Sequence, residues 1–310
     1  MHRLVVALLL AIGLTACSPA PAPAPTAAPN PTATPASLGV DPALVASLPP
    51  LTPFPSPGRM PVGSYMETIY DSGSLIAGVR DDILLFGFLS PRTEQIEGFD
   101  VDIAREIARA IFGDPTKLTL KPVTAAERIP ALKTGQVDII AATMTITPER
   151  KQEVDFSEVY YVAGQRVLVR KDAPYRGIQD LSGKKICAPR GSILEQDIPR
   201  ANPQAEVVLA DKYSDCLRLL QQGQIEAISS GDVILASLAQ QDPNMKVIGG
   251  IIAAEPYGLG VAKGRTEFVA FVNAVLEQIK ADGRWEDIYN KWLGHLGPPP
   301  EPPAGTYRSE

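Results

Sequence analysis

The chain has 310 residues, enough for two domains with additional segments. Its formal net charge is −6 and its pI lies near 5.2, which argues against nucleic acid as a partner. Hydrophobic residues make up 45% of the chain, and this content supports a substantial core.

The first 16 residues have the features of a secretory signal peptide. A basic start at Arg3 is followed by an apolar run over residues 4–14, which is too short to span a bilayer as a helix. The end of the segment, Leu14 to Cys17, resembles a bacterial lipobox. That resemblance implies cleavage before Cys17 and a lipid on its sulfur. An ordinary signal peptide with a chance cysteine is the alternative.

Two proline-rich segments flank the central part of the chain. Residues 17–62 are rich in Pro, Ala, Thr and Ser, a composition that cannot bury a core, so we expect an extended tether that lifts the folded part off the membrane. Residues 298–310 are also proline-rich and are predicted to be disordered.

Two cysteines remain after the lipobox, Cys187 and Cys216. An even pair in an oxidising compartment predicts a disulfide, with two buried free thiols as the alternative. The chain has only two histidines and no CxxC motif, so we predict no metal site.

The central part of the chain predicts an α/β fold built from two units. Apolar strand patterns alternate with amphipathic helices, an order that indicates parallel sheets with covering helices. A further strand at 165–171 leads out of the first unit, and the chain returns near 257–261. Two crossings predict two lobes joined by two strands, which can close on a ligand. The first unit has strands at 75–79, 118–123 and 137–142, and the second at 185–189, 206–210 and 225–229.

One stretch, residues 138–157, combines a buried strand with groups that can bind a ligand. The strand ends in Thr143 and Thr145, and ligands of α/β proteins bind at the carboxyl ends of strands. Thr147 and Pro148 then start a helix that carries Arg150. A guanidinium group matches a carboxylate in a bidentate manner, so Arg150 is a candidate for binding one. A surface salt bridge is the alternative.

Five sequence words occur in the order found in one family. The chain resembles the bacterial extracytoplasmic solute-binding proteins of family 3, which deliver polar amino acids to ABC importers, and most of all the glutamate/aspartate/glutamine-binding lipoproteins. The resemblance spans residues 75–296. The words are IEGFDVDIAREIA (96–108), RIPALKTGQVDI (128–139), IAATMTITPER with VDFS (140–157), YSDCLRLLQQGQIEAI (213–228) and EPYGLGVAKG (255–264).

The resemblance implies a two-lobed periplasmic binding protein type II fold. Lobe one would comprise residues 63–167 and 258–297, because the C-terminal helices return to it, and lobe two residues 168–257. Arg150 would clamp the ligand α-carboxylate, with Thr143 and Thr145 flanking the ligand.

Three further positions are candidates for ligand contacts. Gly191 and Ser192 match the glycine–hydroxyl turn that opens a helix of lobe two, where main-chain amides favour an anion. Arg190 is a candidate for an acidic ligand side chain, with a solvated surface residue as the alternative. Phe86 lies near the expected cleft and can equally belong to the core.

The chain departs from the family where the ligand ammonium is expected. The family has an acidic residue there, but this sequence has Gly231. A buried ammonium without a counter-charge is costly. Either Asp232 takes over this role, or the ligand is another small carboxylate. Asp232 can also serve only as a favourable charge in the first turn of its helix.

The resemblance implies a monomeric extracytoplasmic lipoprotein that captures a polar amino acid for an ABC permease, without a cofactor. A ligand-sensing lipoprotein is the alternative. Some periplasmic dehydratases share this fold, but the expected cleft contains no histidine or other positioned acid–base set, so we expect no enzyme.

Overall fold

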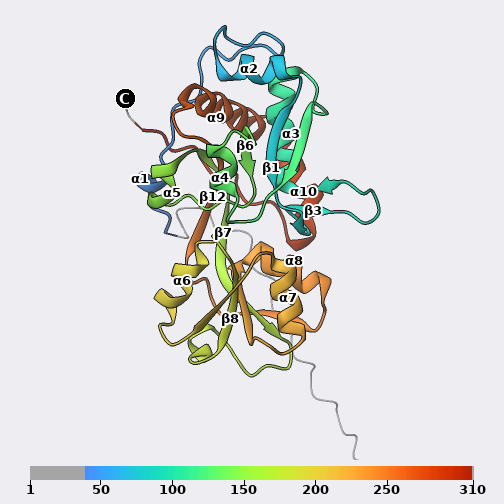
Figure 1. Cartoon of the computed structure of the whole chain (residues 1–310), viewed down its shortest axis with the longest axis vertical. Coiled ribbons are helices and arrows are strands. Elements are labelled where there is room, and N and C mark those ends of the chain that lie inside the picture. The colour runs from blue at the N-terminus through green and yellow to red at the C-terminus, as the bar shows by residue number, and fades with distance from the viewer. Residues whose placement is uncertain (1–38, 309–310) are drawn as a thin grey trace, which may run out of the picture.

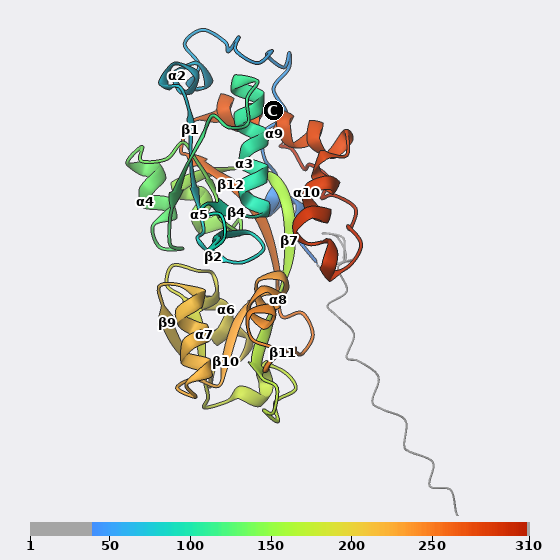
Figure 2. The same cartoon turned by 90° about the vertical axis from the view of Figure 1, so that its right-hand side faces the viewer.

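The structure is a computed structural model that describes residues 39–308. It consists of two α/β lobes, one above the other in Figures 1 and 2, and this confirms the predicted fold class. The predicted signal peptide and Cys17 lie outside the described residues.

Lobe one is the upper lobe in Figure 1 and is built on a mixed sheet. Its strand order is β5-β1-β6-β12-β7, in which β1 pairs in parallel with β5 and β6. The parallel strands are β1 (Leu75–Val79), β5 (Leu118–Pro122) and β6 (Ile139–Ala141). The lobe also contains α2 (Tyr65–Ser72), α3 (Phe99–Phe112), α4 (Arg128–Lys133), α5 (Pro148–Glu153), α9 (Thr266–Ala281) and α10 (Arg284–Trp292). A small antiparallel sheet contains β2 (Asp82–Ile83), β3 (Gly87–Leu89) and β4 (Ile96–Glu97).

Lobe two repeats the α/β plan at a smaller size. Strands β10, β8 and β9 are parallel, and β7 pairs antiparallel with both β10 and β11. The strands are β8 (Lys185–Pro189), β9 (Glu206–Ala210), β10 (Ala227–Gly231) and β11 (Met245–Ile248). The helices are α6 (Leu194–Ala201), α7 (Tyr213–Gln221) and α8 (Asp232–Gln241). Among the described residues, no helix is long and apolar enough to cross a membrane.

Two long strands, β7 (Val154–Arg170) and β12 (Ala254–Ala262), join the lobes. The first part of β7 pairs with β12 in lobe one, and its last part pairs with β10 and β11 in lobe two. The sequence predicted a crossing strand only from residue 165, whereas the structure extends it back to Val154. One continuous strand therefore serves both sheets, and β12 runs beside it.

The core of lobe one follows the predicted helical spacing. Phe99, Ile103, Ile107 and Ile111 of α3 are fully buried. Trp285 of α10 is also fully buried, and its ring meets Phe99 edge-on with centroids 6.0 Å apart. The C-terminal helices thus complete the core of lobe one.

The structure differs from the predicted extended tether over residues 39–62. This segment contains α1 (Pro42–Val45) and packs on lobe one. The side chain of Met60 is buried, and the amide of Leu51 donates to the carbonyl of Ala270 at 2.9 Å. The prediction was wrong here because scattered apolar residues between the prolines are enough to dock an extended segment on an existing core.

The predicted disordered tail also packs on lobe one up to residue 308. Tyr307 forms a parallel bridge with Ser47 and donates its hydroxyl to the buried Glu158. Lys280 pairs with Glu158 at 2.6 Å and donates to the carbonyl of Pro303 at 2.7 Å. The tail is therefore held by a buried charge that composition alone does not reveal.

The predicted disulfide is present between Cys187 of β8 and Cys216 of α7. Both residues are fully buried, and their Cα atoms are 5.6 Å apart. The bond ties a central strand of lobe two to the helix that covers it.

We expect reduction of this disulfide to destabilise the protein by about 3–4 kcal/mol, because the bond closes a loop with a sequence separation of 29 residues in the unfolded chain. Urea unfolding followed with and without dithiothreitol measures this difference. Identical unfolding midpoints under both conditions would contradict it.

Candidate functional site

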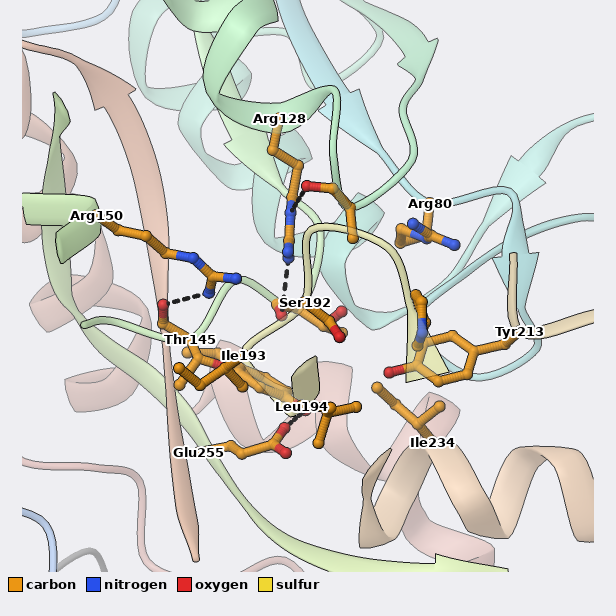
Figure 3. A pocket seen from close by; sticks show the side chains of 14 residues that line it. Arg80, Arg128, Thr145, Arg150, Ser192, Ile193, Leu194, Tyr213, Ile234 and Glu255 are labelled. Carbon is orange, nitrogen blue, oxygen red and sulfur yellow. Dashed lines mark hydrogen bonds between the residues drawn. The ribbon is translucent and has the colours of Figure 1, made fainter. Parts of the chain in front are cut away.

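A cavity lies between the two lobes, beside the strands that join them (Figure 3). Lobe one contributes the ends of its parallel strands and the starts of two helices, lobe two contributes the starts of α6, α7 and α8, and β12 closes one side. The lining residues are Arg80, Ala125, Arg128, Thr143, Thr145, Arg150, Pro189, Ser192, Ile193, Leu194, Tyr213, Ile234, Glu255 and Tyr257.

Three arginines of lobe one line the cavity. Arg80 directly follows β1, and Arg128 is the first residue of α4. Arg150 lies in the first turn of α5, where its amide donates to the side chain of the N-cap Thr147, as predicted. Arg80 and Arg128 are only 2% and 4% exposed, and Arg150 is half-buried. Local strand and helix ends thus bring three cations to one place.

Arg128 and Arg150 are held by main-chain carbonyl groups. Arg128 donates to the carbonyls of Ala142 and Thr143 at 3.0 and 3.3 Å. Arg150 donates to the carbonyl of Thr145 at 2.7 Å. Burial lowers the pKa of Arg128, and the nearby positive charges of Arg150 and Arg80 lower it further. An anion in the cavity would relieve this electrostatic cost.

The lobes touch across the cavity. The carbonyl of Gly191 in lobe two accepts hydrogen bonds from Arg128 Nη2 at 3.4 Å and Arg150 Nη2 at 3.1 Å. At the other edge, Lys212 pairs with Asp81 at 2.7 Å. The structure therefore shows the lobes closed over the cavity.

Lobe two lines the cavity with two hydroxyl-bearing residues, Ser192 and Tyr213, and with several apolar groups. The hydroxyl of Tyr213 is hydrogen-bonded to Ser230 Oγ at 2.6 Å. Ser192 Oγ is buried and makes no hydrogen bond with any described residue. Ile193, Leu194 and Ile234 supply apolar surface beside it. This half of the cavity has few polar partners for a ligand, so the charged groups of lobe one and β12 dominate the site.

Four of the predicted site residues line the cavity: Arg150, Thr143, Thr145 and Ser192. Gly191 contributes its carbonyl to the contact between the lobes. The structure does not bring Phe86 or Arg190 to the cavity. Phe86 is fully buried and packs edge-on against Tyr161, with ring centroids 5.4 Å apart. The Arg190 side chain is 56% exposed and lies 3.6 Å from Asp211.

Asp232 also lies outside the cavity lining. Its Oδ1 accepts hydrogen bonds from the amides of Val233, at 2.8 Å, and Gly164, at 3.2 Å. Asp232 therefore satisfies the first turn of α8 and ties this helix to β7, which agrees with the alternative of a first-turn charge.

The sequence prediction missed Arg80, Arg128, Tyr213, Glu255 and Tyr257 as lining residues. A signal existed for Arg80, which stands at the carboxyl end of a strand as Thr143 does. Arg128, Tyr213 and Glu255 occur inside words that carried the family resemblance. These motifs indicated the family but not which of their side chains face the cavity.

Residues 75–295 match the bacterial extracellular solute-binding proteins, family 3. The chain belongs to this family. Its two-lobed fold and the cavity between the lobes are therefore those of a solute-binding protein.

Relatives and solved structures agree with this assignment. The chain is 41% identical to the ABC transporter glutamine-binding protein GlnH of Bacillus subtilis (strain 168), over 74% of this chain and 84% of the relative. It is 43% identical to the glutamine-binding protein of Geobacillus stearothermophilus, over 64% and 76% of the two chains. An ancestral arginine-binding protein bound to glutamine is similar with a TM-score of 0.67 and 34% identity, covering 72% of this chain and 98% of the other. The solute receptor for L-cysteine of Neisseria gonorrhoeae gives a TM-score of 0.71 at 28% identity, with 74% and 94% covered.

We expect Gly191→Ala to weaken solute binding at least about tenfold, a loss of about 1.4 kcal/mol. Gly191 has φ of +77°, and an added β-carbon would lie 2.6 Å from Ala126 Cα in lobe one, so full closure would be blocked. Calorimetry with the solute that the wild type binds measures the effect.

Gly183→Ala is the matched control. Gly183 has φ of +69°, but an added β-carbon would meet nothing within 4 Å. Both variants carry backbone strain, and only Gly191→Ala obstructs closure. Equal affinities of the two variants would show that Gly191 does not govern closure.

Proposed function

We propose that this chain is the extracytoplasmic binding component of an ABC importer and that its solute is glutamate. The single observation that carries this proposal is the set of three arginines around one closed cavity. Family membership supplies the role of solute binding, and the charge of the cavity narrows the solute.

The charge balance favours an acidic amino acid. With Glu255 in its carboxylate form, the three arginines and Glu255 give the lining a net charge of +2, and the ion pair of Arg80 with Asp82 at 2.6 Å reduces this to +1. Glutamate at neutral pH carries a net charge of −1 and would make the closed site neutral. Glutamine would leave one uncompensated buried positive charge, which is costly in a closed cavity.

Within this site, Arg150 would bind the α-carboxylate, as the family resemblance implies. Arg128, whose Nη2 donates to the same Gly191 carbonyl as Arg150 Nη2, would receive the side-chain carboxylate. Bidentate guanidinium–carboxylate pairs are stronger than neutral hydrogen bonds and fix the orientation of the ligand. Thr143, Thr145 and the unpaired hydroxyl of Ser192 would supply further hydrogen bonds.

Glutamine is the second candidate. The two relatives at 41% and 43% identity are named as glutamine-binding proteins, which supports a solute of the same length with a carboxamide. The same Arg150 would hold its α-carboxylate, so the two solutes differ only in what faces Arg128 and Arg80.

We also propose that Cys17 carries a lipid that anchors the protein at the outer face of the cell membrane, and that it acts as a monomer with a permease partner. The lipobox-like end of the signal peptide supports the anchor. Membrane fractionation of the wild type and Cys17→Ser checks it, and unchanged attachment of the variant would contradict it. A permease and ATPase encoded beside this gene would favour import over sensing.

We assign solute binding without catalysis to this cavity. The cavity lining contains no histidine or cysteine, and Glu255 is its single carboxylic acid. Proton transfer in both directions requires a positioned acid–base set, which one carboxyl group beside three arginines does not provide.

Calorimetry of the purified protein with glutamate, glutamine, aspartate, arginine and cysteine tests the proposed function. We expect glutamate to bind most tightly. Among these five it alone combines a net charge of −1, which balances the +1 charge of the site, with a side chain as long as that of glutamine. Tighter binding of glutamine would favour the second candidate, and binding of none of the five would contradict amino-acid binding.

Arg150→Ala should weaken glutamate binding about 30- to 5000-fold, since removing one partner of a buried charge pair costs about 2–5 kcal/mol. Arg190→Ala is the control, because Arg190 is exposed and lies outside the cavity. A loss below threefold for Arg150→Ala, or an equal loss for both variants, would contradict the assigned role of Arg150.

A further inference from the structure

The glycine at position 231 lies next to a carboxylate from another strand. A β-carbon added to Gly231 would lie 3.2 Å from Glu255 Oε2 and 2.6 Å from the hydroxyl of Tyr257. Glu255 and Tyr257 both belong to β12, whereas Gly231 ends β10. The volume that a side chain at position 231 would enter is therefore already occupied by an acidic group and its hydrogen-bond partner.

Glu255 forms no salt bridge with any described residue, and Arg150 is the cation that faces it. The residue is 4% exposed and lines the cavity. Its Oε2 accepts a hydrogen bond from Tyr257 at 3.1 Å, but its buried Oε1 has no hydrogen-bond partner among the described residues. A buried carboxylate with one unpaired oxygen is costly, and such a group is usually paired or hydrogen-bonded. The free oxygen is thus a binding position for a donor that carries positive charge.

We propose that Glu255 binds the ammonium group of the amino-acid ligand, in place of the acidic side chain that position 231 lacks. This inference rests on the proposed amino-acid binding. It adds a ligand-binding residue on β12, one of the two strands that join the lobes. The ammonium group of the ligand would then contact the hinge directly.

The position of Glu255 suits a zwitterionic ligand. In Figure 3 Glu255 lies on the opposite side of the cavity from Arg128 and Arg80, with Ser192 between them. The cavity therefore has a cationic side for carboxylates and an anionic side for an ammonium. Asp232, the other acidic residue near position 231, directs its Oδ1 to the amides of Gly164 and Val233 and does not line the cavity.

Ligand binding should then be coupled to the release of a proton from Glu255. Burial raises the pKa of Glu255 to about 7; the hydrogen bond from Tyr257 opposes this rise. The ammonium requires the carboxylate form, so binding below about pH 7 releases a proton from Glu255, and affinity falls as the pH drops below 7. The other charged or titratable groups facing Glu255 are Asp197 and Asp232, which raise its pKa, Arg150, which lowers it, and Tyr213.

The decisive variant is Glu255→Gln, with Asp232→Asn as its matched control. Each substitution replaces a buried carboxyl group by an amide of nearly the same shape, and the amide oxygen introduced by Asp232→Asn can still accept both main-chain hydrogen bonds. The probes are glutamate or glutamine, whichever the wild type binds, and the same compound without its amino group, glutarate or glutaramate.

We expect Glu255→Gln to weaken binding of the amino acid at least about thirtyfold at pH 8 and to leave binding of the deaminated compound unchanged or tighter. Asp232→Asn should change both affinities less than threefold. Equal losses for the two compounds in Glu255→Gln, or a selective loss of the amino acid in Asp232→Asn, would overturn the inference.

Proton release gives a second, independent measurement. Calorimetry at pH 6 in two buffers of different ionisation enthalpy should show proton release on binding to the wild type and none for Glu255→Gln. Equal proton release by both proteins would overturn the inference even if the affinities changed. Amino-acid binding that survives Glu255→Gln at full strength refutes this inference alone, whereas a wild type that binds no amino acid refutes the proposed function and the inference together.

Discussion

Positive charge enclosed between the two lobes dominates the electrostatics of the cavity. Arg80 and Arg128 are almost fully buried, yet Arg128 and Arg150 bond only to main-chain carbonyl oxygens among the described residues. Carbonyl dipoles hold a guanidinium in place but do not cancel its charge. The closed arrangement therefore favours a bound anion, and the free energy of anion binding stabilises the closed state of the two lobes.

The two strands that join the lobes allow the cavity to open and close. Strand β7 runs through both sheets and β12 pairs beside it, so the lobes can move relative to each other while each keeps its own core. The polar contacts that bridge the lobes include two arginines on the carbonyl of Gly191, the ion pair of Lys212 with Asp81, and the amide of Tyr213, which donates to Asp82 Oδ2 at 2.7 Å. Such contacts are worth little when exposed to water, so we infer that the ligand supplies most of the stability of the closed state.

The fold could be predicted almost completely from the sequence, because it depends on repeated local patterns. The stripe of Phe99, Ile103, Ile107 and Ile111 is buried as its spacing indicates, and Thr147 caps the helix that carries Arg150. The predictions failed where packing depends on distant residues. The segment around Met60 and the tail around Tyr307 are held by lobe one, and their proline-rich composition gives no indication of that surface.

The site was predictable only in part, for a related reason. Arg150, Thr143 and Thr145 stand at the end of one strand, where a general rule of α/β folds places ligands. Glu255 and Gly231 are 24 positions apart in the sequence and become neighbours only because β12 and β10 both flank β7. The sequence showed that an acidic group was missing at position 231. Only the packing of the strands showed that the carboxyl group of Glu255 lies beside Gly231.

A crystal structure of the protein with glutamate bound would show which residues hold the carboxylate and ammonium groups of the ligand. We expect the α-carboxylate on Arg150 and the ammonium within hydrogen-bond distance of Glu255 Oε1, with the lobes closed through Gly191. An ammonium group that instead contacts Asp232, or a carboxylate that contacts neither Arg150 nor Arg128, would contradict this expectation.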